Sequence, residues 1–229
     1  MTISPSSARS DRGFTLAELL VTCAIIGFVM GGLFSVLVSG QQTYLSGTNQ
    51  VQAQQELRLM IGRMSNEIRN AGYCPTCGTG TPPIAAFTAI TAASPTGFTI
   101  QNDWDGSWDG AAGISAGAVT YNIVGSDGTP VPVQRGEQIV YAFNAGTLTR
   151  REIGVDASAQ PLAGGLASLS FSYLDATGAA LTGNPITTPA NIRTVVINVV
   201  GQPTGPSTFQ SGKVQVPMTA SVRVRNRAL

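Results

Sequence analysis

A 25-residue apolar segment near the start of the chain, Phe14–Val38, most constrains what this protein can fold into. Glu18 is its only charged residue. At about 1.5 Å per residue, an α-helix of this length crosses a bilayer core of roughly 30 Å. The segment therefore predicts a helix that spans a membrane.

The single carboxylate in this segment needs a partner. A charged side chain inside an apolar helix costs about 3 kcal/mol or more, and such residues usually pair or mark a function. In the low dielectric of a bilayer, Glu18 would be compensated by a cationic group placed opposite it. The alternative is an ordinary single-span anchor that tolerates a charge near its end.

A short polar leader, residues 1–13, precedes the apolar segment and ends at Gly13. It contains Arg9, Asp11 and Arg12. A secretory signal peptide has its cleavage site after the apolar stretch, whereas this chain continues from that stretch into a polar helical pattern. Any cleavage is therefore expected before the apolar segment.

The sequence RGFTLAE at residues 12–18 closely resembles the prepilin signature of type IV pilins and type II secretion pseudopilins. In that family a prepilin peptidase cuts after the glycine, methylates the new N-terminal amine and leaves a glutamate at the fifth mature position. The resemblance implies cleavage between Gly13 and Phe14, N-methylation of Phe14, and an assembly role for Glu18. In that role Glu18 would pair with the cationic N-terminal amine of a neighbouring subunit, and the pairing would favour one axial register during assembly. It also implies a single-pass protein of the bacterial inner membrane that later enters a pilus or pseudopilus.

Residues 39–72 turn polar without a proline. Four apolar residues in this part share one helical face because they follow a 4-3-4 spacing. They are Leu57, Ile61, Met64 and Ile68. We expect one helix from about Phe14 to Asn70, with residues 14–38 in the membrane and 39–72 as an amphipathic half packed on a globular domain. A break at Ser39-Gly40 or Ser46-Gly47 into two helices is the alternative.

Gly72 is placed to end the helix in a left-handed cap, on which Tyr73 can fold back. The sequence IRNAGY at residues 68–73 resembles the segment that ends the long helix in PilW-like minor pilins and related J-type pseudopilins.

Cys74 and Cys77 follow at once, in the sequence CPTC. A structural zinc ion needs four ligands, but the chain has no histidine and only one further cysteine, Cys23, in the membrane segment. A redox-active pair is disfavoured because a helix C-terminus does not stabilise a thiolate. A structural disulfide between Cys74 and Cys77 remains, and an extracytoplasmic compartment permits it.

Beyond Thr79 the pattern changes to short strands separated by turn residues. The expected strands are Gly97–Gln101, Ala118–Val124, Glu137–Phe143, Thr147–Ile153, Leu166–Leu174, Ile192–Val200 and Val214–Arg225. Asn144-Ala145-Gly146 joins two of them as a tight hairpin. The chain is thus expected to be α+β, a long N-terminal helix packed on an antiparallel β-sheet, with residues 73–229 as an extracytoplasmic β-rich domain. The pilin family has the same order.

One stretch of this domain carries a candidate cation site. DWDGSWDG at residues 103–110 has oxygen side chains at alternate positions, Asp103, Asp105, Ser107 and Asp109, as the start of a calcium loop does. It departs from the EF-hand pattern because Trp108 stands where glycine is needed and Ile114 where a bidentate glutamate is needed. Calcium, which some members of the family use, is one interpretation. A solvated turn whose aromatic residues pack on the sheet or a neighbour is the other.

Composition disfavours several classes of function. Charged residues make up 11% of the chain and the net charge is +1, so no nucleic-acid partner is expected. The chain has no histidine and Lys213 is its only lysine, which removes the commonest general bases, so no enzyme is expected.

The resemblance favours a PilW-like minor pilin that takes part in initiating and assembling a type IV pilus. Its expected partners are prepilin peptidase, other pilin or pseudopilin subunits and the inner membrane. A J-type minor pseudopilin of a type II secretion system is the first alternative. A pilus-tip adhesin or ligand-binding module, with Trp104 and Trp108 exposed, is the second.

Overall fold

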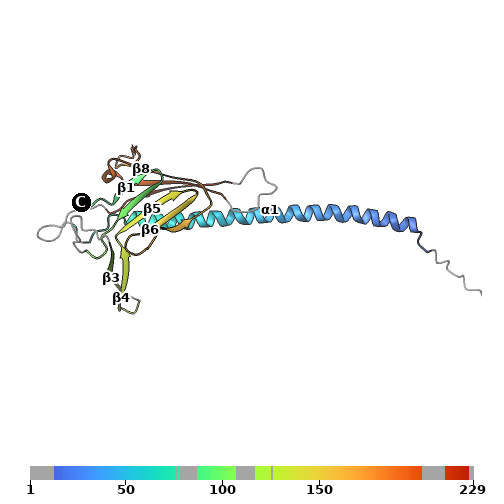
Figure 1. Ribbon diagram of the computed structural model, residues 1–229, viewed down its shortest axis with the longest axis horizontal. Coiled ribbons are helices and arrows are strands. Elements are labelled where there is room, and N and C mark those ends of the chain that lie inside the picture. Colours follow the sequence, from blue (N-terminus) through green and yellow to red (C-terminus); the bar gives the residue numbers. More distant parts are fainter. Residues whose placement is uncertain are drawn as a thin grey trace, which may run out of the picture. The chain divides into compact units, whose positions relative to one another are not determined.

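The computed structural model describes residues 13–75, 77, 87–106, 117–124, 126–202 and 215–226. One long helix comes first along the chain, and antiparallel strands follow it (Figure 1). The predicted α+β class is therefore confirmed. The chain divides into two compact units, Met1–Thr48 and Asn49–Leu229.

Helix α1 runs without interruption over Leu16–Asn70. The alternative of two helices is therefore wrong for this structure, because Gly40 and Gly47 both lie inside α1. A glycine in a helix interior costs about 1 kcal/mol relative to alanine, and neither glycine breaks this 55-residue helix.

One face of α1 is buried in the second unit. Its fully buried residues are Leu57, Met60, Met64 and Ile68. The predicted stripe is confirmed, because Leu57, Met64 and Ile68 are buried and Ile61 is partly buried and packed against the core. Met60, which was not predicted, is buried beside them. Residues 60 and 61 flank the same stripe on opposite sides at 3.6 residues per turn, so the shape of the sheets decides between them.

The strands form two main sheets and a separate ribbon. The first sheet has the order β1-β2-β5-β6-β7, with β1 Ile90–Ser94, β2 Gly97–Gln101, β5 Gln138–Asn144, β6 Thr147–Glu152 and β7 Gln160–Ala163. The second has the order β11-β10-β8-β9, with β11 Val216–Arg223, β10 Thr194–Gly201, β8 Leu166–Leu174 and β9 Ala180–Leu181. Strands β3 Ala118–Val124 and β4 Pro130–Gly136 form the ribbon, and a short 3₁₀ helix covers Pro189–Asn191.

The expected strands are all present. Strands β2, β3 and β8 have the predicted bounds, and the other four differ by a few residues at one or both ends. Strands β1, β4, β7 and β9 were not predicted. Strand β4 was missed because it contains Pro130 and Pro132, and proline is tolerated only at the edge of a sheet.

The core forms where the buried face of α1 meets the inward side chains of both sheets. Strand β10 shows the alternation clearly, with Val195, Ile197 and Val199 buried. The rings of Phe98 in β2 and Phe171 in β8 meet edge to face with centroids 4.9 Å apart, so they join the two sheets. Burying each large apolar side chain contributes about 1.5–3 kcal/mol, and this cluster therefore fixes the helix on the sheets.

The β3–β4 ribbon is an insertion between two strands that pair directly. Strands β2 and β5 are antiparallel neighbours, with Gln101 opposite Gln138. The residues just after β2 and just before β5 therefore meet at the base of the ribbon, where the backbone N–H of Asn102 donates to the carbonyl oxygen of Glu137 at 2.8 Å. The sheet register thus brings the loop after β2, which contains Asp103 and Asp105, close to Glu137.

Candidate functional sites

The first turn of α1 is closed by a reciprocal capping box. The backbone N–H and the hydroxyl of Thr15 both donate to Oε2 of Glu18, each at 3.0 Å. In return the backbone N–H of Glu18 donates to Oγ1 of Thr15 at 3.3 Å. This is the S/T-x-x-E arrangement in which an N-cap residue and the third helical residue satisfy each other's free donors. Glu18 therefore has a second role that its charge alone did not indicate.

The part of α1 that follows this box is apolar and exposed. It is long and apolar enough to cross a membrane, as judged by length and composition. Phe28 is 85% exposed and Val36 is 72% exposed, and Cys23 is a free, exposed cysteine. Such a surface requires lipid or other apolar helices around it.

The other end of α1 is tied to the sheet. Gly72 has a φ of +79°, which confirms the predicted left-handed cap. Its N–H donates to the carbonyl oxygen of Gln101 at 2.8 Å, and the N–H of Asp103 donates to the carbonyl oxygen of Tyr73 at 2.7 Å. The disulfide between Cys74 and Cys77 follows, as expected from the sequence. The turn after the helix is therefore held both by hydrogen bonds and by a covalent link.

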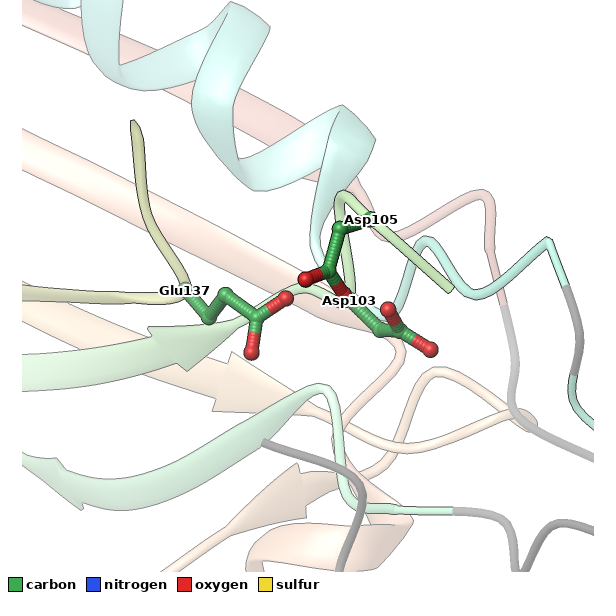
Figure 2. Close-up of side chains that lie close together, drawn as sticks. All are labelled: Asp103, Asp105 and Glu137. Atoms are coloured by element: carbon green, nitrogen blue, oxygen red, sulfur yellow. The ribbon is translucent and has the colours of Figure 1, made fainter. Parts of the chain in front are cut away.

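Three carboxylates gather beside this turn (Figure 2). Asp103 and Asp105 lie in the loop after β2, Glu137 lies just before β5, and one oxygen from each lies within 4.8 Å of the others. Asp103 and Glu137 are fully buried and Asp105 is exposed. Sequence reasoning missed Glu137, which lies far along the chain, and only the pairing of β2 with β5 could have placed it here.

Backbone amides satisfy part of this cluster. The N–H of Trp104 donates to Oε1 of Glu137 at 2.9 Å, and the N–H of Gly106 donates to Oδ1 of Asp103 at 2.7 Å. Carboxylate oxygens are the ligands that calcium prefers, so the residues present are of the right type. Ser107 and Asp109 lie outside the described residues, and the calcium site at Asp103, Asp105, Ser107 and Asp109 stays a prediction.

Trp104 packs within an aromatic cluster. Its ring centroid lies 5.5 Å from that of Tyr73 and 6.1 Å from that of Tyr121, with which it stacks. The guanidinium of Arg135 lies 4.8 Å from the centre of the Trp104 ring, at cation–π distance. Trp104 is therefore partly buried by its own domain, which weakens its role as an exposed adhesive residue. Trp108 lies outside the described residues.

A buried ionic network lies behind the base of the ribbon. Nη2 of Arg150 donates to Oε2 of Glu152 at 2.7 Å, and Nε of Arg135 donates to Oε1 of Glu152 at 3.0 Å. On the helix side, Glu67 binds Arg150 and accepts the hydroxyl of Tyr141. Glu67 is not part of the predicted apolar stripe of α1, and it is half-buried against the sheet.

The network shifts the proton affinity of its members. Burial alone would lower the pKa of Arg150, but hydrogen bonds and charge attraction from Glu67 and Glu152 outweigh it and raise that pKa. Burial and the nearby charge of Glu67 raise the pKa of Tyr141. Both groups therefore keep their protons at any physiological pH, and the network is a fixed structural link.

Comparison with known families finds a match at the N-terminal end of the chain. Residues 8–34 match the prokaryotic N-terminal methylation motif. No curated protein matches the chain. The motif covers the end of the leader from residue 8, the Gly13-Phe14 junction, the capping box and much of the apolar segment. Together with the long apolar helix and the antiparallel β-sheets that follow, it supports a type IV pilin-like protein.

Proposed function

We propose that this chain is a PilW-like minor pilin that takes part in initiating and assembling a type IV pilus through its N-terminal helix. The methylation motif supports a pilin or pseudopilin subunit, and it points to a structural subunit and not to an enzyme. The observation that carries the proposal is the position of Glu18, which stands inside that motif and in the first turn of an exposed apolar helix.

In the proposed mechanism, prepilin peptidase cuts between Gly13 and Phe14 and methylates the new amine of Phe14. The carboxylate of Glu18 then receives the cationic amine of a neighbouring subunit in the membrane. Its Oε2 is engaged by Thr15, whereas Oε1 accepts no hydrogen bond from the described residues. The capping box therefore holds the carboxylate in place and leaves one oxygen for the neighbour.

The capping box also gives a matched pair of variants. Glu18→Gln keeps an oxygen that can cap Thr15, because glutamine also forms this box, but it removes the charge. Thr15→Ala removes the hydroxyl from the capping box and keeps the charge of Glu18. If charge pairing drives assembly, the first variant is processed and inserted into the membrane but is not incorporated into filaments. Incorporation of Glu18→Gln at the level of the unchanged chain would rule out the pairing.

The first measurement is the intact mass and the N-terminal peptide mass of the protein from membranes that contain prepilin peptidase. A chain that begins with methylated Phe14 is expected, and Gly13→Val should keep the leader. A chain that still begins at Met1 beside an active peptidase would leave residues 14–38 as a plain anchor. Co-purification with pilus subunits then supports the minor pilin, whereas co-purification with type II secretion pseudopilins favours the J-type alternative.

A further inference from the structure

The two edges of the β3–β4 ribbon differ in how they can meet another strand. Strand β4 carries Pro130 and Pro132, and proline cannot donate to a further backbone ladder. Strand β3 has neither a proline nor a charged residue, and β4 is its only partner strand within the part of the chain that the structure describes. Alternate residues of such a strand direct their N–H and C=O groups away from the partner. The outer edge of β3 is therefore suited to accept another strand.

The ribbon also has an apolar face that its own domain covers only in part. Val119, Tyr121 and Ile123 share this face because side chains alternate along a strand. Val119 is 6% exposed at the base, and Tyr121 stacks on Trp104. Toward the tip, Ile123 is 45% exposed and Val131, opposite it in β4, is 42% exposed. Figure 1 shows this ribbon extending away from the two main sheets.

The sequence of β3, AVTYNIV, is self-complementary about Tyr121. If two copies run antiparallel with their Tyr121 residues opposite each other, Val119 faces the partner's Ile123 and Thr120 faces the partner's Asn122. Aromatic pairs, β-branched pairs and hydrogen-bonding pairs of this kind stabilise neighbouring strands, and no like charges meet. We propose that β3 pairs in this register with β3 of a second copy of this chain.

This pairing produces a closed dimer. Two copies related by a twofold axis use the same edge, so no β3 edge is left for a third copy. The joined sheet has the order β4-β3-β3-β4, and its outer strands are those that carry the prolines. A Cβ on Gly154 would lie 2.2 Å from the backbone N of Ala118, so the base of β3 is approached closely by its own domain. The pairing is therefore centred on Val119–Ile123.

A contact of this length depends on how often two copies meet. Pairing over Val119–Ile123 buries much less than the interface of about 1,600 Å² that is typical of stable complexes. Helix α1 is long and apolar enough to cross a membrane, and two copies anchored in one membrane meet at a high effective concentration. The dimer is therefore expected in membranes that contain the full chain.

The test places cysteines on the opposite, polar face of β3. Thr120 and Asn122 are exposed, so Thr120→Cys and Asn122→Cys leave the core unchanged. Residues directly opposite in an antiparallel pair have Cα atoms about 4.5–5.5 Å apart, which a disulfide bridges. Both changes are made in a Cys23→Ser chain, because Cys23 is a free, exposed cysteine. The two variants carry different tags, are co-expressed in membranes and are oxidised, and dimers are measured on a nonreducing gel.

The mixed sample should form cross-linked dimers about tenfold faster than either variant alone, because Thr120 faces the partner's Asn122 and not the partner's Thr120. The control mixes Asn122→Cys with Gln134→Cys. Gln134 lies opposite Thr120 in the ribbon, so it would be two strands away from the partner's Asn122. If the mixed sample cross-links no faster than this control, β3 does not pair with a second copy. Faster cross-linking of Thr120→Cys with itself would overturn the register.

Two charge variants test the same contact without a cross-link. In Thr120→Glu/Asn122→Glu like charges would face each other across the dimer, whereas in Thr120→Glu/Asn122→Lys opposite charges would do so. Förster transfer between labelled copies in phosphatidylcholine vesicles measures their association. The association constant of the first variant should be about tenfold lower than that of the second. Equal constants would show that these residues do not meet, and the proposal would be wrong.

Discussion

Nε of Arg150 in strand β6 lies 3.1 Å from both carboxylate oxygens of Glu67 in helix α1. Arg150 is 6% exposed, and its Nη2 also binds Glu152, which is 7% exposed. One buried guanidinium thus connects the amphipathic part of the helix with strand β6 of the first sheet. Three acidic side chains form ion pairs with it: Glu67, Glu152 and, at 3.6 Å, Asp156.

Replacing Arg150 by methionine should destabilise the domain strongly. Glu67 and Glu152 would keep buried negative charges without their main partner, which costs about 3–5 kcal/mol in comparable buried pairs. The free energy of unfolding of the full chain in detergent, followed by circular dichroism in urea, measures this. Arg151→Met is the control, because Arg151 is exposed and its side chain bonds only weakly, at 3.4 Å, to the carbonyl oxygen of Ala157. Similar losses for the two variants would show that the network contributes little.

The same network predicts a loss of stability in acid. Burial alone would raise the pKa of Glu152, but hydrogen bonds from Arg150 and the N–H of Gly136, with the charge of Arg135, lower it below the ordinary value of 4.5. The unfolded chain therefore binds more protons than the folded chain just below that value. The stability that Glu152 contributes is fully present above about pH 4.5 and is lost as the pH falls through the lowered pKa.

The variant Glu152→Gln isolates this contribution. It should be less stable than the unchanged protein at about pH 7, and the difference should shrink as the pH falls below about 4.5. Urea unfolding at a series of pH values measures both curves. Parallel curves across that range would mean that Glu152 does not carry the acid dependence.

Two glycines of the same helix region should respond to alanine with opposite signs. A Cβ on Gly72 would lie 2.5 Å from the carbonyl oxygen of Asn226 and would force alanine into a left-handed backbone, so Gly72→Ala should destabilise by about 2 kcal/mol or more. Gly62 lies inside α1 with open space around it, so Gly62→Ala should stabilise by about 1 kcal/mol. Thermal unfolding of both variants gives the two signs. A stable Gly72→Ala would contradict the assigned cap.

The predicted calcium site has a direct measurement. If calcium binds at the acidic loop, isothermal titration of the chelator-treated full chain should show one binding event and the melting temperature should rise with calcium. Asp103→Asn should weaken this binding strongly, and Glu137→Gln should do so only if Glu137 supplements the predicted ligands. If the melting temperature does not change with calcium up to millimolar concentration, the loop is a hydrogen-bonded turn and not a calcium site.

The sequence correctly predicted the structural features that depend on residues close together in the chain. The uninterrupted apolar run and the absence of proline predicted one helix, and Gly72 predicted its end. The hairpin at Asn144-Ala145-Gly146 was predicted from its residues, and it forms a two-residue turn in which Ala145 and Gly146 both have positive φ. Period and turn chemistry act within a few residues, so they can be read from the chain itself.

The rest depends on contacts between distant segments. Glu137 joins Asp103 only because β2 pairs with β5 across the ribbon, and Arg150 reaches Glu67 only because β6 lies against the helix. No short sequence motif predicts either of these two contacts. Met60 is more deeply buried than Ile61. This difference also depends on the surface of the sheets, which helical periodicity does not describe.

The prolines of strand β4 have a consequence for how chains meet one another during folding. A strand at the edge of a sheet offers its free N–H groups to any other extended chain, and this is a common start of aggregation. Pro130 and Pro132 have no N–H to offer, and the N–H of Gly136 is already bonded to Glu152 at 2.8 Å. Strand β4 therefore offers few N–H donors to a strand of another chain. This side of the exposed ribbon should resist edge-to-edge aggregation before the chain binds its partners.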